Sequence, residues 1–128
     1  MPYIYSKAAE LKDEPVVGSR QCVALVQEYA GAPTTTYWRQ GEPVMGNKTI
    51  KEGTAIATFV NGRYPNRPHG NHAALFVREV ANGIVVADQW KADKKTKISV
   101  RTIRSQGKDK KGKFVNPSEN ADAFFVIE

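Results

Sequence analysis

Cysteine and histidine are scarce in this sequence, which contains one cysteine, Cys22, and two histidines, His69 and His72. A single cysteine excludes an intramolecular disulfide, and no group of Cys and His residues has the spacing of a zinc site. No apolar run approaches the ~20 residues that a membrane-spanning helix requires. The first residues also lack the apolar stretch and cleavage site of a secretory signal. We therefore expect a protein made in the cytoplasm, which any export must move without a signal peptide.

Acidic residues are outnumbered by basic ones, 13 against 19, which gives the 128-residue chain a net charge of +6. Its hydrophobic content of 41% is enough for one core, so we expect one domain over residues 1–128. The basic residues concentrate between Lys91 and Lys113, where ten of them accompany two acidic residues. This segment predicts either a solvated hairpin with a basic loop or a surface that attracts a polyanion, such as a cell-wall polymer, a phospholipid surface or nucleic acid.

Two short helices are predicted in the first quarter of the chain. The first runs from about Ser6 to Lys12 and the second from Ser19 to about Ala30, each with its serine as a candidate N-cap. Pro15 and Gly18 separate them, and Gly31 stands where a helix C-cap is expected.

Strands are predicted for most of the rest of the chain. Residues 34–51 form a loop rich in Gly, Pro and Thr, in which Tyr37 and Trp38 are candidate anchors, and residues 61–70 form another loop. The expected strands are Thr54 to Val60, His72 to Val80, Ile84 to Trp90, Ile98 to Ile103 and Ala123 to Ile127. Asn82-Gly83 between two of them is a strong hairpin signal. Helices followed by an antiparallel meander indicate an α+β domain.

Cys22 is predicted to lie in the first turn of the second helix. There a thiol meets the positive end of the helix dipole and free backbone N–H groups, which favour the thiolate and can also donate to an oxyanion. The neighbouring Gln21 adds an amide donor, and Arg20 adds positive charge. Two interpretations of Cys22 remain open: a buried packing residue, which is common for a free cysteine, or a nucleophile, which needs a base.

His72 is the better candidate for that base. His69 stands between a proline and a glycine in a turn, where a side chain is poorly fixed, whereas His72 opens a strand whose next two residues are alanines. On its own, His72 could equally be an ordinary histidine at a strand end. Its assignment as a base therefore depends on a partner that orients the ring.

Asp88 and Gln89 are the candidates for the residue that orients His72. If the hairpin pairs residue 77 with residue 88, both lie within reach of the ring, given an uncertainty of a few residues in register. They point to opposite faces of the strand, so only one can serve. Asp88 is favoured because a carboxylate also stabilises the imidazolium, although it could instead be an exposed residue paired with a lysine.

These elements, in this order, resemble the CHAP and NlpC/P60 branch of papain-like peptidoglycan amidases. Residues 18–26 resemble the helix start that carries the nucleophile, and residues 53–59 the strand introduced by a glycine. Residues 70–77 resemble the strand that carries the histidine, and residues 88–90 hold the polar third residue. The likeness covers about Gly18 to Trp90. The chain departs from it at Thr54, where many relatives have Asp, and at Asn71, which separates Gly70 from His72.

The resemblance implies a papain-like fold, with N-terminal helices packed on an antiparallel sheet. It implies a cysteine hydrolase that cleaves amide bonds in peptidoglycan peptide through Cys22, His72 and Asp88, without a metal or other cofactor. The short length and the missing signal also resemble small amidase effectors, which bacteria deliver into a rival's periplasm and usually pair with an immunity protein.

Two other functions remain open. The first is a papain-like acyltransferase, deamidase or protease that acts on protein. The second is a basic nucleic-acid-binding module, in which Cys22 only packs. The sequence argues against the second, because it contains no known nucleic-acid motif and its aromatic residues are not interleaved with the basic segment.

Overall fold

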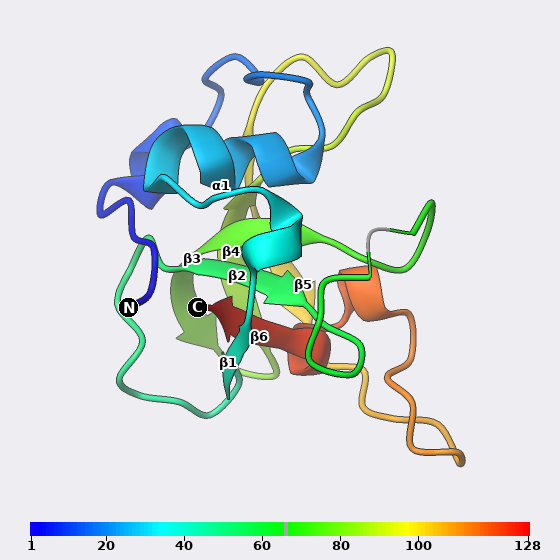
Figure 1. The fold of residues 1–128 in the computed structure, drawn as a ribbon. Helices are drawn as coiled ribbons and strands as arrows, with labels where there is room; N and C mark the ends of the chain where they lie inside the picture. Colours follow the sequence, from blue (N-terminus) through cyan, green and yellow to red (C-terminus); the bar gives the residue numbers. More distant parts are fainter. Residues whose placement is uncertain (66) are drawn as a thin grey trace.

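A six-stranded antiparallel sheet forms the centre of the computed structural model, which describes residues 1–65 and 67–128 (Figure 1). The strands are β1 (Gln40–Pro43), β2 (Ala55–Thr58), β3 (Ala73–Val80), β4 (Gly83–Asp88), β5 (Ser99–Arg104) and β6 (Phe124–Ile127). Strands β2 to β5 follow one another as the predicted meander, and β6 returns to pair between β1 and β2. The chain therefore ends in the strand next to the β1 edge of the sheet.

One α-helix, α1 (Cys22–Ala30), lies across one face of this sheet (Figure 1). It packs on β3 through a core that includes Leu25 and Val26, and Gly31 caps its C-terminus as predicted. The predicted start at Ser19 is wrong, because Arg20 has a left-handed backbone (φ 72°) that a helix cannot contain. The helix therefore begins at Cys22 itself.

The predicted first helix, Ser6 to Lys12, is a single 3-10 turn over Ala8–Leu11. Ser6 does not cap it, because the residue before the turn is Lys7, whose side chain makes no capping bond. The N–H of Ala9 in the turn donates instead to Oε2 of Glu52 (3.4 Å). The turn exists because Ala8 and Leu11 are both buried against the sheet. The expected pair of N-terminal helices is thus reduced to one α-helix and this turn. The other 3-10 turns are Thr35–Tyr37, Pro117–Glu119 and Ala121–Ala123.

The predicted loop over residues 34–51 contains edge strand β1, which the sequence analysis missed. This strand has no apolar alternation, and it ends in Pro43, a residue that strands accept mainly at an edge. Of the two predicted anchors, Trp38 is buried and its indole N–H donates to the carbonyl of Pro33 (2.8 Å). Tyr37 is 72% exposed, so its prediction as an anchor was wrong.

Both faces of the sheet are buried. Ile56, Phe76 and Val86 face a core on the side away from α1, which explains why β2 and β4 are buried along their whole length. The face under α1 is instead rich in small side chains, and its alanines are Ala55, Ala57, Ala73 and Ala87. Because the spacing between packed elements depends on the side chains at their contact, these alanines let α1 lie close to the sheet.

Gly53 lets the N-terminal segment cross the start of β2. Its backbone is left-handed (φ 90°), and a Cβ at this position would lie 1.8 Å from the carbonyl oxygen of Tyr5. The backbone N–H of Tyr5 donates to the Gly53 carbonyl (2.9 Å). Next to it, the buried hydroxyl of Thr54 donates to the Lys51 carbonyl (2.7 Å). Thr54, at the position where many relatives have aspartate, is therefore a buried residue whose hydroxyl has a hydrogen-bond partner.

The basic segment between Lys91 and Lys113 does not form one surface. Antiparallel strand β5 divides it into the β4–β5 loop and a second loop after β5, at opposite ends of the strand (Figure 1). The segment predicted as a hairpin with a basic loop thus contains two such loops, one that joins β4 to β5 and one closed by the bridge between Lys108 and Phe114. In the described part of the chain, no helix has the length and apolar character needed to cross a membrane.

Candidate active site

Cys22 is the first residue of α1 and is partly buried against the core under the helix. A tight turn delivers it there: the N–H of Arg20 donates to the carbonyl of Val17 (3.0 Å), and Arg20 takes the left-handed conformation. Residues held in this sparsely populated region often cluster at functional sites. The sulfur therefore stands at the end of the helix where free N–H groups converge.

Gln89 holds the segment that precedes α1. Its amide nitrogen donates to the carbonyls of Val17 (3.0 Å) and Gln21 (2.9 Å), and its amide oxygen accepts from the N–H of Val17 (2.9 Å). Both of its donor hydrogens are thus used away from the histidine. The alternative assignment of Gln89 as the partner of the ring is wrong. Gln21 precedes Cys22 with an exposed side chain, next to the helix start.

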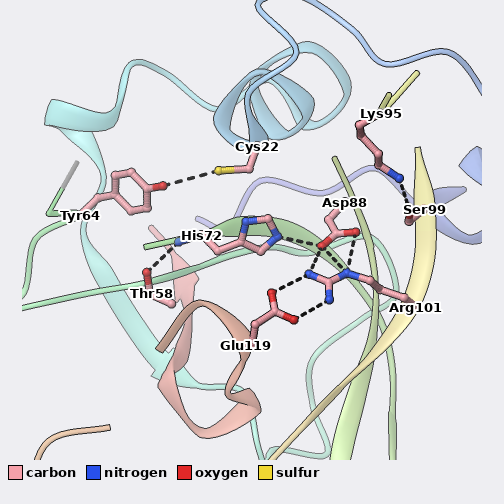
Figure 2. A network of polar contacts seen from close by, with 9 residues as sticks. All are labelled: Cys22, Thr58, Tyr64, His72, Asp88, Lys95, Ser99, Arg101 and Glu119. Carbon is pink, nitrogen blue, oxygen red and sulfur yellow. Dashed lines mark hydrogen bonds and ion pairs between the residues drawn. The ribbon is translucent and has the colours of Figure 1, made fainter. Parts of the chain in front are cut away.

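His72 is buried just before β3, where its N–H donates to the hydroxyl of Thr58 (3.0 Å). Its ring Nε2 lies 2.8 Å from Oδ2 of Asp88, which is fully buried. This leaves ring atom Nδ1 on the side of Cys22, so the imidazole stands between the thiol and the carboxylate (Figure 2). The structure therefore brings together the three residues that the sequence analysis selected.

The pairing that brings Asp88 to His72 differs from the predicted register. Leu75 is opposite Ala87, and an irregularity between Phe76 and Arg78 shifts the rest of the hairpin. Asp88 therefore comes opposite residue 74. This is three positions nearer to His72 along the strand than the predicted partner, residue 77. The alternative picture of Asp88 as an exposed residue paired with a lysine is also wrong.

The charges in this site favour a thiolate beside an imidazolium. Burial alone would raise the pKa of the Cys22 thiol, but hydrogen bonding to His72 and the charge of its ring hold the pKa below its usual value. Burial alone would lower the pKa of His72, but its interactions with Asp88 and Cys22 raise this pKa to about 9. The two shifts therefore favour a thiolate paired with an imidazolium near neutral pH, the form in which a thiol can act as a nucleophile.

Arg101 and Glu119 extend the polar contacts beyond Asp88, and the sequence analysis missed both as site residues. The guanidinium of Arg101 donates to both carboxylate oxygens of Asp88 and to both oxygens of Glu119. The alternation of side chains along β5 could have indicated that Arg101 lies on the same face as Asp88. Because Asp88 is opposite Ser99, the residue two positions later projects from the same face.

Tyr64 is a further site residue that sequence reasoning missed. Its hydroxyl oxygen lies 3.7 Å from the sulfur of Cys22 and accepts from the amide nitrogen of Asn71 (3.2 Å). Its ring is buried and packs on Trp38, with ring centres 4.9 Å apart. Asn71, where the chain departs from the family pattern, thus fixes the position of the Tyr64 hydroxyl. The available signal was weak: one aromatic residue in a polar loop, eight positions before His72.

An open cleft of about 410 Å³ lies against His72. Trp90, Arg101, Glu119 and the exposed His69 line it as well. His69 makes none of the contacts that join His72 to the thiol and the carboxylate. Among the described residues, no group of three or more His, Cys, Asp or Glu side chains is arranged to hold a metal ion.

The chain is similar over nearly its whole length to proteins described as amidase effectors. Residues 4–127 match the family model described as domesticated amidase effector 2. A type VI secretion amidase effector 2 protein of Salmonella typhi is 47% identical over 133 residues, 100% of either chain. The domesticated amidase effector 2 of Ixodes scapularis is 37% identical over 88% of this chain and 73% of that protein. A solved structure of type 6 secretion amidase effector 2 matches with a TM-score of 0.90 and 46% identity, covering 98% of this chain and 94% of that chain.

Proposed function

Because the chain belongs to the domesticated amidase effector 2 family, it is an amidase, and we propose that it hydrolyses amide bonds in the peptide of bacterial peptidoglycan. In this proposal Cys22 is the nucleophile, His72 is the base and acid, and Asp88 orients the ring. One observation carries the assignment: a buried imidazole stands between the chain's one thiol and a buried carboxylate (Figure 2).

The first half of the reaction forms an acyl-enzyme. The thiolate of Cys22 attacks the carbonyl carbon of the peptide bond and gives a tetrahedral intermediate with a negative oxygen. The imidazolium of His72 gives its proton to the leaving nitrogen, the C–N bond breaks, and the amine departs. The acyl group remains on sulfur as a thioester, and His72 is left neutral.

The second half releases the acyl group. Neutral His72 takes a proton from a water molecule, whose oxygen attacks the thioester carbon. The C–S bond then breaks, the carboxylic acid leaves, and the thiolate and imidazolium are restored. Asp88 keeps the ring in one orientation and stabilises its charged form in both halves.

Donors of three kinds near Cys22 are suited to the oxyanion. The backbone N–H groups at the start of α1 point towards the region in front of the sulfur. The hydroxyl of Tyr64 accepts from Asn71, so its own hydrogen is free to point at the sulfur or at an oxygen bound next to it. The exposed amide of Gln21, adjacent to Cys22 in sequence, is the third.

We also propose that the chain adopts a papain-like fold of the CHAP and NlpC/P60 type. Its support is the order of the parts: a nucleophile at the start of a helix, then a strand that follows the histidine, then a carboxylate at the end of the next strand. As an effector, the protein would act in the periplasm of a rival cell, and the producing cell would hold an immunity protein against it. The two basic loops could help it dock on an anionic wall.

The test of the proposed function is digestion of purified peptidoglycan sacculi. We expect soluble muropeptides whose masses show one added water at each cut, in the peptide stem or the cross-link, and negligible cleavage of denatured proteins. The same protein, alkylated at Cys22 with iodoacetamide, serves as the blank. A protein that leaves sacculi intact but cleaves, deamidates or acylates polypeptides would contradict the proposal in favour of an enzyme that acts on protein.

Replacing Tyr64 with phenylalanine is expected to lower kcat on muropeptides by about 10- to 100-fold with little change in KM. The reason is that the variant keeps the ring that packs on Trp38 but removes a donor aimed at the developing negative charge. Steady-state kinetics on a purified muropeptide would measure the effect. Tyr29→Phe, on α1 and away from the sulfur, is the matched control. Equal kinetics for Tyr64→Phe and the parent protein would remove Tyr64 from the mechanism.

A further inference from the structure

Asp88 bonds to a second cation as well as to His72. Its Oδ2 lies 2.8 Å from the ring nitrogen of His72, and the same oxygen accepts from Nε of Arg101 (2.9 Å) and lies 2.8 Å from Nη2 in an ion pair. The other edge of the guanidinium faces Glu119, with Nη1 2.7 Å from Oε1 and Nη2 3.1 Å from Oε2. With His72 protonated, charge therefore alternates in sign from the ring to Glu119 (Figure 2).

We propose that Arg101 and Glu119 are positioning residues that set the orientation and the proton affinity of His72 through Asp88. The inference rests on the proposed role of His72 and goes beyond it, because it adds two residues that touch neither the thiol nor the ring. It also assigns to Arg101 and Glu119 opposite effects on the proton affinity of His72.

Orientation follows from the geometry of the guanidinium. Its Nε donates to both oxygens of Asp88 and its Nη2 lies 2.8 Å from Oδ2, so the carboxylate cannot rotate away from the ring without breaking charge-assisted contacts with the planar guanidinium. Burial alone would raise the pKa of Asp88, but the contacts with His72 and Arg101 hold it below its usual value. Asp88 is therefore ionised near neutral pH, with Oδ2 at the ring nitrogen.

The effect on the proton follows from the signs of the charges. The cation of Arg101 opposes the positive charge of a protonated His72, whereas the anion of Glu119 offsets that cation. Removing the charge of Arg101 should raise the pKa of His72, and removing the charge of Glu119 should lower it. A purely structural role for the two residues would not give opposite signs.

Other titratable groups surround His72 and must stay constant in the test. Around the ring and its cleft they are Cys22 from α1, Tyr64 from the segment after β2, His69 from the same segment, and Lys95, whose ammonium lies 4.1 Å from the centre of the Trp90 ring. Cys22 is the group most strongly linked to the ring, because each of the two shifts the pKa of the other. Replacing Cys22 in all samples therefore isolates the contribution that Asp88, Arg101 and Glu119 make to the pKa of His72.

The experiment is an NMR titration of the His72 imidazole in the full-length Cys22→Ala protein. We expect Arg101→Met to move the midpoint up by at least about 0.5 pH unit and Glu119→Gln to move it down by a similar amount, with the double variant between them. Arg104→Met is the matched control, because Arg104 lies on the same strand and donates to the carbonyl of Ala81. The titration needs no substrate, so its result does not depend on whether the protein digests peptidoglycan.

Unmoved midpoints, or shifts of the same sign for Arg101→Met and Glu119→Gln, would overturn the inference. If Arg101→Met does not fold, Arg101→Lys replaces it, because lysine keeps the charge but lacks the planar fork. Arg101→Lys should then leave the midpoint near that of the parent while Glu119→Gln still lowers it. In protein that retains Cys22, Arg101→Lys should lower kcat by about 10-fold with KM unchanged, since a misaligned carboxylate affects the chemical step. The absence of either effect would also count against the proposal.

Discussion

Replacing Cys22 with alanine is expected to lower the rate of muropeptide release from sacculi by at least about 1,000-fold. The reaction as proposed forms a thioester on this sulfur, and the sequence contains no other cysteine that could take its place. The Cβ atom and the helix start remain, so the protein should keep its fold. Quantified muropeptides give the rate, and far-UV circular dichroism with thermal unfolding checks the structure.

Cys22→Ser provides a stricter control, because the hydroxyl has nearly the shape of the thiol but is a far poorer nucleophile at neutral pH. We expect it to be as inactive as Cys22→Ala and to bind muropeptides as the parent protein does. Substantial digestion by a folded Cys22→Ala protein would show that Cys22 only packs against the core.

His72→Ala is expected to reduce activity by a similar factor of about 1,000, whereas His69→Ala should change it by no more than about threefold. The difference follows from position: His72 is buried between the thiol and Asp88, whereas His69 is exposed at the rim of the cleft. Initial rates of muropeptide release from the two variants and the parent protein would measure the contrast.

His72→Gln serves as the control for stability, because its amide can still donate to Asp88 and fills more of the space that alanine leaves empty. It should be folded and inactive. If His69→Ala abolished activity and His72→Ala did not, the base would be His69 and the assignment made here would be reversed.

The parts of the site that follow from local signals could be predicted from the sequence. Pro15 and Gly18 precede α1 and Gly31 follows it, so these local signals alone place Cys22 near a helix N-terminus. The Asn82-Gly83 signal similarly joined β3 to β4 and brought Asp88 near His72, despite the error in register. The resemblance to amidases rested on these motifs, whereas the resemblance to small effectors rested on the length of the chain and on analogy. The family match and the two relatives confirm that the chain belongs to an amidase effector family.

The parts that depend on distant pairing could not be predicted in the same way. Gln89 secures Val17 across 72 positions of sequence, and the hydroxyl of Tyr64 reaches Cys22 across 42. Neither contact leaves a periodic pattern, because each residue acts through one side chain in an irregular segment or at a strand end. Strand β1 was missed for a related reason: it is polar and lies at an edge, so it has no apolar alternation.

The alanines beneath α1 have a consequence for the chemistry above them. A cysteine side chain is short, with its sulfur only one bond beyond Cβ, so it meets an imidazole on the sheet only if the helix axis lies close to the strands. Valine or leucine in place of one of these four alanines would add apolar volume, yet would lift the helix and move the sulfur of Cys22 away from the ring of His72. The small side chains of this face therefore set how closely the sulfur of Cys22 can approach the ring of His72.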